Sequence, residues 1–216
     1  MKISNSPAIR RMPTYLHRLF ELRSAGREWV SCAELAQYMN IPHIVVRKDI
    51  AMTALPGHKR HGFRVNELIE AVLKLVGWDK KVPAALIGAG SLGAALLGFD
   101  DFQAYNFRIE SVFDSAPAKI GQVIHGRTVC PVDDIEKLLQ ENPPKVGIIC
   151  VPPAAAQKVA DILVSLNIRY IWNFSNVCLN VPEGVIVQRE VIAGGLAVLF
   201  AKINKAESGE AVPCEE

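Results

Sequence analysis

The chain lacks several features that mark membrane, secreted and disulfide-bonded proteins. It has no apolar run of the roughly 18 residues that a transmembrane helix needs, so we expect no membrane partner. No apolar segment follows the first residues, MKISNSPAIRR, so we expect no signal peptide. The five cysteines are scattered and include no C-x-x-C pair. This usage favours reduced thiols in a cytoplasmic protein.

The net charge is small but unevenly distributed. The whole chain carries +2, with 24 Lys and Arg against 22 Asp and Glu. Residues 1–81 hold 14 Lys and Arg against 7 Asp and Glu, whereas residues 82–216 hold 10 against 15. This asymmetry predicts two parts with different partners, and the basic part is a candidate for binding nucleic acid. A solvated basic surface explains the charge count equally well, so the motifs must discriminate between the two.

Helical periodicity dominates the first eighty residues. Apolar residues over 9–22 recur at helical spacing, with a start at Ser6-Pro7 and an end at Ala25-Gly26. Pro13 should kink this helix or force it to restart. A later helix is expected from Asn66 to Gly77, where it would connect the two parts of the chain.

Between them lies the spacing of a helix-turn-helix. Ser31 and Glu34 are placed as in a capping box, which predicts a helix over about residues 32–39. Ile41-Pro42 then opens another, over about 43–53. Two short helices joined by a tight turn are typical of this motif, and its second helix, with Arg47 and Lys48, would enter the major groove. Such three-helix modules also serve as dimerisation domains.

The stretch HKRHGFRV, residues 58–65, is basic and contains no acidic residue. Together with the apolar alternation that ends it, the stretch predicts a β-hairpin with a basic tip, the wing of a winged helix-turn-helix. Lys59 and Arg60 would then lie along phosphates or in the minor groove. His58 and His61 are three residues apart, but no neighbouring Cys or carboxylate completes a ligand set, so we expect no metal site.

A nucleotide-binding motif follows. Gly88-x-Gly90-x-x-Gly93 lies between an apolar strand over 84–87 and a helix over 91–97, the context that this motif requires. The first glycine permits a tight turn, the second lets the backbone approach a pyrophosphate, and the third allows close packing of helix and strand. The helix N-terminus would present N–H groups to the phosphates.

Asp114 ends the next predicted strand, residues 108–114. It lies where an acidic residue would accept a hydrogen bond from an adenosine ribose 2′-hydroxyl. A carboxylate there favours NAD over NADP, because it would repel a 2′-phosphate. Lys119 is close enough to reach the adenosine side, although a solvated lysine explains it as well.

Further α/β alternation predicts a doubly wound sheet, class α/β. Strands are expected over 145–151, 169–174 and 184–188, with a helix after the first. Ligands bind at the carboxyl ends of such strands, which places Val151, Pro152, Asn173, Phe174 and Ser175 beside the nicotinamide. A last helix over 190–206 is apolar nearly all round and should be buried against something.

The sequence lacks the catalytic residues that a small dehydrogenase would need. No Tyr-x-x-x-Lys motif occurs, and the only histidine after the glycine motif is His125, in what IHGRT indicates is a surface turn. A hydride-transfer enzyme needs a proton donor near the nicotinamide. We therefore expect no enzyme activity and no catalytic residues, and we interpret the nucleotide as a signal.

Taken together, the motifs resemble the Rex redox-sensing transcriptional repressors of bacteria, over about residues 6–204. The segments that carry the resemblance are VRKDI (46–50), KRHGF (59–63), GAGSLG (88–93), FDSAPAKIG (113–121), VPPAAAQKVAD (151–161) and NIRYIWNFSNVCLNVPEGV (167–185). The resemblance implies a homodimer with a domain-swapped last helix and a palindromic operator, bound with NAD+ and released by NADH.

The resemblance also implies a domain plan and two sets of site residues. The plan is a winged helix-turn-helix over 1–80, a Rossmann domain over 81–189, a swapped helix over 190–206 and a disordered tail over 207–216. The candidate DNA contacts are Arg10, Arg11, His43, Arg47, Lys48, Lys59, Arg60 and His61. The candidate NAD(H) contacts are Gly88, Ala89, Gly90, Ser91, Leu92, Gly93, Asp114, Lys119, Val151, Pro152, Asn173, Phe174 and Ser175.

Three positions depart from the family. Where its members carry an arginine, a tyrosine and an aspartate that form a redox switch, this chain has His17, Phe99 and Val191. This departure raises an alternative, an adenine-nucleotide-binding module with weak or no redox discrimination. The nucleotide half also resembles the CoA-binding domain of acyl-CoA ligases, so CoA is a second candidate ligand.

Overall fold

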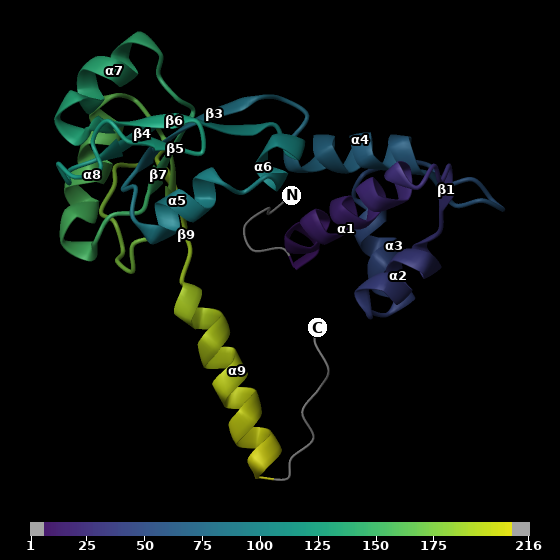
Figure 1. Ribbon diagram of the computed structural model, residues 1–216. Coiled ribbons are helices and arrows are strands. Elements are labelled where there is room, and N and C mark those ends of the chain that lie inside the picture. Colours follow the sequence, from purple (N-terminus) through teal and green to yellow (C-terminus); the bar gives the residue numbers. More distant parts are fainter. Residues whose placement is uncertain (1–6, 209–216) are drawn as a thin grey trace. The chain divides into compact units, whose positions relative to one another are not determined.

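The computed structural model describes residues 7–208, which form two compact units (Figure 1). The chain passes from one unit to the other between Lys80 and Lys81. Within residues 7–208, no helix combines the length and apolar character that crossing a membrane requires. The predicted tail, 207–216, lies outside the described residues apart from its first two.

The first unit is helical with one small sheet. Its elements are α1 (Pro7–Ser24), β1 (Trp29–Val30), α2 (Cys32–Met39), α3 (His43–Ala51), β2 (Phe63–Arg64) and α4 (Val65–Val76). The helix-turn-helix spacing is confirmed: Ser31 caps α2 by accepting a hydrogen bond from the Glu34 N–H at 3.1 Å, and Asn40 ends it in the left-handed region.

Of the two outcomes expected at Pro13, the restart is wrong, because α1 runs through that residue as one helix, and the kink stays a prediction. Met12 and Leu16, both fully buried, hold it to the core on either side of the proline. The loss of one backbone hydrogen bond is therefore tolerated by tertiary packing. The core of this unit also contains Leu35 of α2 and Leu68 of α4.

The wing is built differently from the expected local hairpin. Its strand β2 pairs antiparallel with β1, which precedes α2, in the register Trp29 to Arg64. Within residues 58–65 only one bridge forms, between His58 and Gly62. Gly62 has φ +81°, and a Cβ there would meet the Val30 carbonyl oxygen, so this close approach of the loop to β1 requires glycine.

The second unit is a seven-stranded sheet with helices on both faces. Its strands are β3 (Val82–Ile87), β4 (Phe107–Asp114), β5 (Val123–Ile124), β6 (Arg127–Pro131), β7 (Val146–Ile149), β8 (Tyr170–Asn173) and β9 (Ile186–Arg189). Its helices are α5 (Ser91–Leu97), α6 (Asp101–Ala104), the 3-10 helix η1 (Val132–Asp134), α7 (Ile135–Glu141), α8 (Pro153–Ser165) and α9 (Ile192–Glu207).

Strand order fixes where a ligand would bind. The order is β5-β6-β4-β3-β7-β8-β9, and all neighbours are parallel except β5 and β6. From β3 the chain winds outward through β4 and β6, and it then returns to β7 on the other side of β3. The carboxyl ends of β3 and β7 therefore form a topological switch point, where open α/β sheets bind ligands.

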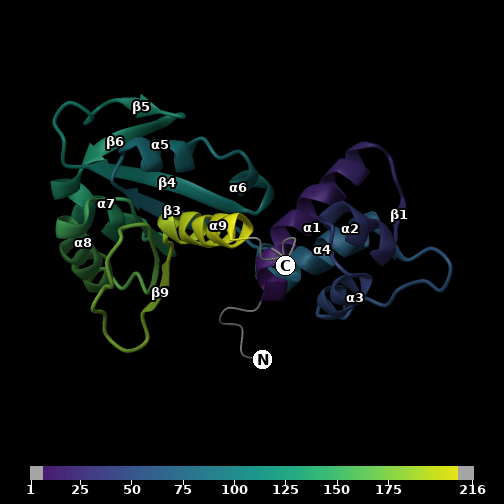
Figure 2. The same cartoon turned by 90° about the horizontal axis from the view of Figure 1, so that it is seen from below.

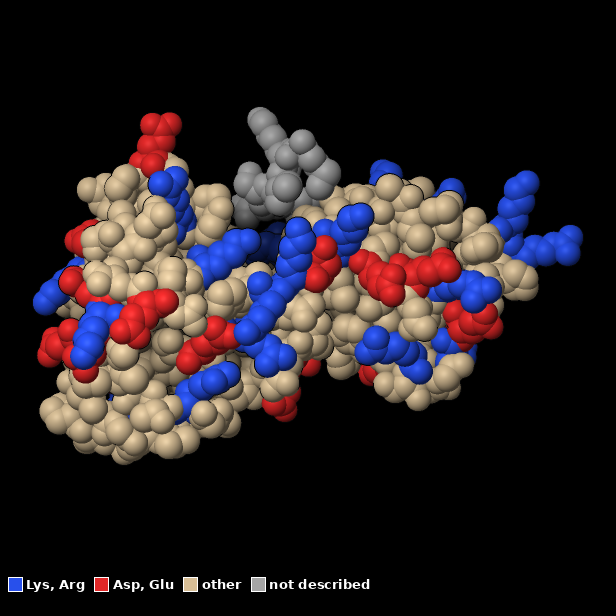
Figure 3. All heavy atoms as spheres, turned by 90° about the horizontal axis from the view of Figure 1, so that it is seen from above, with Lys and Arg blue, Asp and Glu red and all other residues tan. Residues whose placement is uncertain are grey.

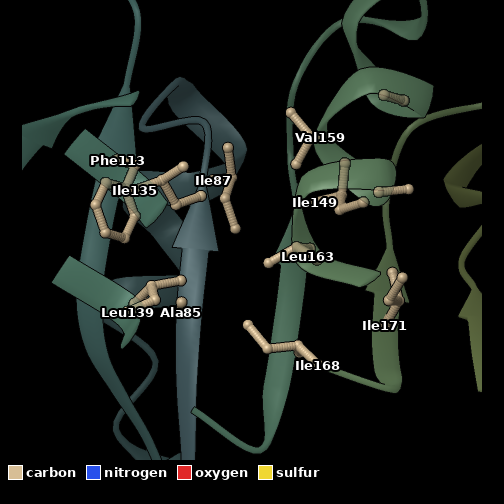
Figure 4. Close-up of a cluster of buried hydrophobic side chains, with 12 residues drawn as sticks. Ala85, Ile87, Phe113, Ile135, Leu139, Ile149, Val159, Leu163, Ile168 and Ile171 are labelled. Carbon is tan, nitrogen blue, oxygen red and sulfur yellow. The ribbon is translucent and has the colours of Figure 1, made fainter. Parts of the chain in front are cut away.

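Alternating residues of the central strand divide the core into two layers. Ala85 and Ile87 of β3 pack in the layer that contains α7 and α8, whereas Ala84 and Leu86 face the layer that contains α5 and α6. Figure 4 shows the first layer, with side chains of α7 and of α8 against the sheet, and Figure 2 gives a second view of the two layers. The doubly wound α/β class is thus confirmed.

The last helix has no buried residue, although its sequence is strongly apolar. Its exposed apolar side chains are Ile192, Leu196, Val198, Leu199, Phe200 and Ile203. The burial that the sequence predicts is therefore not supplied by residues 7–208 of the same chain.

Candidate functional site

A cavity of about 650 Å³ lies at the switch point, within the size range of sites for small ligands. It is lined by residues at or just after the carboxyl ends of β3, β4, β6 and β7. The lining residues are Ile87, Gly88, Gly90, Asp114, Ser115, Lys119, Val132, Asp133, Cys150, Val151, Pro152, Ala155, Lys158, Val159 and Ile162. Its wall is mainly apolar. The charged side chains in it are those of Asp114, Lys119, Asp133 and Lys158.

The glycine motif has the geometry that the sequence predicts. Gly88 has φ +102°, and a Cβ there would lie 2.6 Å from the Cys150 carbonyl oxygen on the neighbouring strand. A Cβ on Gly93 would meet the Gly88 carbonyl oxygen, so α5 packs directly on the turn. At Gly90, in contrast, a Cβ would meet no protein atom within 4 Å. Open space at Gly90 is the feature that lets a pyrophosphate approach the backbone.

The carboxylate of Asp114 is already held on both oxygens. One oxygen accepts hydrogen bonds from the Ala89 N–H at 2.8 Å and from Lys119 Nζ at 3.1 Å, and the other accepts from the Ala116 N–H at 2.8 Å. Burial raises the pKa of Asp114, but these bonds outweigh it and hold the pKa below its usual value. Asp114 thus fastens the glycine loop as well as facing the cavity, where a carboxylate oxygen can accept a further bond.

Two charged cavity residues were missed by sequence reasoning. Asp133 lies in η1, just after β6, and Lys158 lies in α8. Neither residue belongs to a recognisable sequence motif. Each lies at the cavity because of how η1 or α8 packs against the sheet, which the local sequence does not reveal. The spacing of Lys158 from Pro152, about one and a half helical turns, would have been the only available signal.

Asn173, which ends β8, and Ser175 support the cavity rather than line it. Asn173 is fully buried, donates to the Val177 carbonyl at 3.0 Å and accepts from the Ser175 N–H at 2.9 Å. The Ser175 hydroxyl donates to the Val151 carbonyl at 2.6 Å, which fixes that wall of the cavity. Neither Asn173 nor Ser175 is among the residues that line the cavity, and their direct contact with a ligand stays a prediction. Ala89, Ser91, Leu92 and Gly93 are also absent from the lining.

Phe174 faces a second, apolar pocket of about 350 Å³. This pocket is lined by Leu96, Phe99, Phe102, Trp172, Phe174, Glu190, Val191 and Ile192. Phe99 packs edge-on against Phe102 with ring centroids 4.8 Å apart, and Trp172 donates to Glu190 at 3.3 Å. Phe99 and Val191, two of the three positions at which the resemblance implies a departure, therefore line the same pocket.

In the first unit, α3 presents a basic face. His43, Arg47 and Lys48 are exposed on it, whereas Val46 and Ile50 are buried on the opposite face. This division follows helical periodicity. The exposed residues are the ones that the sequence predicts to contact DNA. Arg10 is also exposed, on α1.

Arg11 does not belong with these exposed residues. Its guanidinium donates to both oxygens of the buried Asp49, from Nε at 2.7 Å and from Nη2 at 2.9 Å. The pKa of Arg11 is raised, chiefly by this bond. Its positive charge is therefore paired with Asp49, and direct contact of Arg11 with DNA stays a prediction.

The wing carries an aromatic and basic cluster. Trp29 of β1 packs against His58 and His61, at centroid distances of 4.9 and 5.1 Å, while the Arg64 guanidinium stacks on it at 4.9 Å. Lys59 and Arg60 in the loop before β2 are both exposed, and Figure 3 shows Lys and Arg side chains on this face of the molecule in blue. Among residues 7–208, no group of His, Cys, Asp or Glu is arranged to hold a metal ion.

These features define a class of protein: a winged helix-turn-helix unit followed by a Rossmann-type unit with a cavity at its switch point. Two family models match parts of the chain. One, described as "Putative DNA-binding protein N-terminus", matches residues 2–51, and the other, described as "CoA binding domain", matches residues 79–177.

Whole-chain relatives give a narrower assignment. A redox-sensing transcriptional repressor Rex from Treponema denticola is 38% identical over 94% of this chain and 97% of its own length. A Rex repressor from Clostridium botulinum is 34% identical over 92% and 95%. The crystal structure of RSP, a Rex-family repressor, with β-NAD+ and operator DNA has a TM-score of 0.84 at 31% identity, covering 98% of this chain and all of that one. The chain belongs to the Rex family of redox-sensing transcriptional repressors.

Proposed function

We propose that this chain is a DNA-binding transcriptional repressor that responds to the NADH/NAD+ ratio. The observation that carries the proposal is the full-length match to Rex repressors, including RSP structures with β-NADH and with β-NAD+ and operator DNA. The chain has both parts that such a response needs, a basic α3 face with a wing and a switch-point cavity.

DNA contact is assigned to the exposed basic residues of the first unit. Arg47 reads base edges in the major groove, and Lys48, Lys59 and Arg60 neutralise phosphates. His43, His61 and Arg10 are also exposed and complete the proposed set of contacts. Mutating a phosphate contact should weaken binding to all sequences alike, whereas mutating Arg47 should weaken binding selectively at one base position.

NAD(H) is assigned to the switch-point cavity, with its pyrophosphate at Gly88 and Gly90 and its adenosine ribose at Asp114. Lys119 and Lys158 supply positive charge at the cavity, and Val151 and Pro152 form its wall toward the nicotinamide. The nucleotide acts as a signal rather than a reagent, which agrees with the regulators to which the chain is similar. We place the protein in the cytoplasm, where NAD(H) and DNA are both present.

The protein acts as a homodimer on a palindromic operator, and α9 is swapped into the partner. The support is physical: α9 exposes Leu196, Leu199 and Phe200, each by more than half of its surface. Exposed apolar surface of this kind marks an interaction site. A two-fold dimer would read two half-sites one helical turn of DNA apart, or a multiple of this distance.

A second candidate function is a nucleotide-binding DNA-binding protein with weak redox discrimination. The observation that favours it is the apolar pocket at Phe99 and Val191, where the family has polar switch residues. At the third position, the Nε2 atom of His17 lies 3.3 Å from a carboxylate oxygen of Glu21. CoA remains a candidate ligand for the same cavity.

Calorimetric titration of the protein with NADH, NAD+ and CoA, followed by gel shift with operator fragments, distinguishes these candidates. Repression under redox control requires tighter binding of NADH and loss of the shift when NADH is added. Equal affinities for NADH and NAD+ would favour the second candidate, and preferential binding of CoA would refute the NAD(H) assignment.

A further inference from the structure

One buried carboxylate in the first unit belongs to neither of the two surfaces described above. Asp49 lies in α3, and only 3% of its surface is exposed. It accepts three hydrogen bonds from α1: two from the Arg11 guanidinium, at 2.7 and 2.9 Å, and one from the Tyr15 hydroxyl, at 2.9 Å. We call these three residues the α1–α3 clamp.

The clamp joins the helix that carries the DNA contacts to the longest helix of the unit. Asp49 follows Arg47 by two residues, which is about 200° around a helix, so the two side chains leave α3 on opposite sides. Any rotation of α3 about its axis that moves Arg47 also moves the Asp49 carboxylate away from Arg11. The orientation of the exposed face is therefore coupled to the geometry of the clamp.

Apolar packing alone fixes this orientation poorly. α3 has nine residues, too short to be stable by itself, so its position depends on tertiary contacts. The contacts of Val46 and Ile50 are apolar and carry no directional preference. A two-point bond between a planar guanidinium and a planar carboxylate, in contrast, fixes distance and angle together.

We propose that Asp49 is a positioning residue for DNA recognition, which holds the exposed face of α3 in register through Arg11 and Tyr15. This inference rests on the proposed DNA-binding function. Arg11 then supports the affinity for DNA indirectly. Its two hydrogen bonds to Asp49 hold α3 in position, and its charge is not attracted to the DNA itself. Burial also raises the pKa of the Tyr15 phenol, so it remains a hydrogen-bond donor at neutral pH.

The test compares variants of the full-length protein on one DNA duplex. The duplex is selected from a random-sequence library with the wild-type protein, and affinities are measured by fluorescence anisotropy over a series of salt concentrations. The clamp variants are Arg11→Lys, Tyr15→Phe and Asp49→Asn. Lys48→Ala serves as the control for a lost phosphate contact. Ile69→Ala, a buried residue of α4, serves as the control for lost stability.

We expect Arg11→Lys and Asp49→Asn to lower the affinity for DNA by about tenfold or more and Tyr15→Phe to lower it less. The slope of log affinity against log salt should stay at the wild-type value in all three, because no phosphate contact is removed. Lys48→Ala should reduce the slope by about one. Nucleotide affinity should be unchanged throughout. If Asp49→Asn does not fold, the other two variants still decide the question. Arg11→Lys keeps a hydrogen-bond donor, and Tyr15→Phe keeps the packing of the aromatic ring.

Three results would overturn the proposal. A higher affinity and a steeper salt slope for Asp49→Asn, which frees the Arg11 guanidinium from its partner, would mean that Arg11 contacts phosphate directly. Wild-type affinity in a folded clamp variant would mean that the clamp does not position α3. An equal loss of affinity in Ile69→Ala at matched melting temperature would mean that the effect is general stability. Failure of the wild-type protein to select any duplex refutes the DNA-binding function itself, and with it the clamp's role.

Discussion

Substitution of Gly90 by alanine should separate nucleotide binding from folding. A Cβ at Gly90 meets no protein atom within 4 Å, and its φ of −72° suits alanine. The free energy of unfolding should therefore change by less than about 1 kcal/mol, because alanine restricts the unfolded chain but is a poorer N-cap for α5 than glycine. The new methyl group would occupy the side of the cavity where a pyrophosphate approaches the backbone.

The expected loss of affinity follows from overpacking. Inserting a methyl group into a filled site costs about 1–3 kcal/mol, which corresponds to a roughly five- to 150-fold weaker affinity. Calorimetry with NADH measures this loss, and thermal unfolding measures the stability. The matched variant is Gly93→Ala, whose Cβ would meet the Gly88 carbonyl oxygen and should lower the melting temperature. If Gly90→Ala binds NADH as tightly as the wild type, the pyrophosphate does not lie on this backbone.

Three other predictions address charge, reactivity and assembly. Because the folded-state pKa of Asp114 lies below 3.8, its carboxylate stabilises the fold above that pH, and the stabilisation is lost as the pH falls further. Asp114→Asn should therefore flatten the fall in melting temperature below about pH 4, and an unchanged slope would contradict this role. Burial raises the pKa of Cys150 to about 12, so at pH 8 iodoacetamide should modify the exposed Cys178 well before it, as peptide mass spectrometry can follow. Phe200→Asp on α9 should convert a dimer into monomers in sedimentation experiments, and an unaltered dimer would exclude α9 from the interface.

Local signals predicted the elements that carry the two sites. The cap at Ser31, the glycine that ends α4 at Gly77 and the spacing Gly88-x-Gly90-x-x-Gly93 each depend on the nearest few residues. For this reason the helix-turn-helix and the start of the Rossmann unit could be predicted with bounds close to those observed. Six of the predicted nucleotide contacts also line the cavity, because they follow strand ends or glycine turns.

Tertiary pairing accounts for what the sequence could not predict. β1 has only two residues, too few to show the alternation of apolar and polar residues that predicts a strand. Its pairing with β2 could therefore not be predicted from the sequence around it. The elements between residues 115 and 145 were not predicted, since β5, β6 and η1 are each at most five residues long and the helix α7 has only seven residues. Arg11 lies 38 residues from Asp49, and a basic residue near a predicted DNA surface was therefore assigned to DNA rather than to a buried partner.

A single titration shows whether NAD(H) controls DNA binding by this protein. The affinity of the full-length protein for its selected operator is measured by fluorescence anisotropy without nucleotide, with saturating NAD+ and with saturating NADH. If NAD(H) controls DNA binding, the complex is steeply salt-dependent, persists with NAD+ and is weakened by NADH. The same affinity in all three conditions would contradict it.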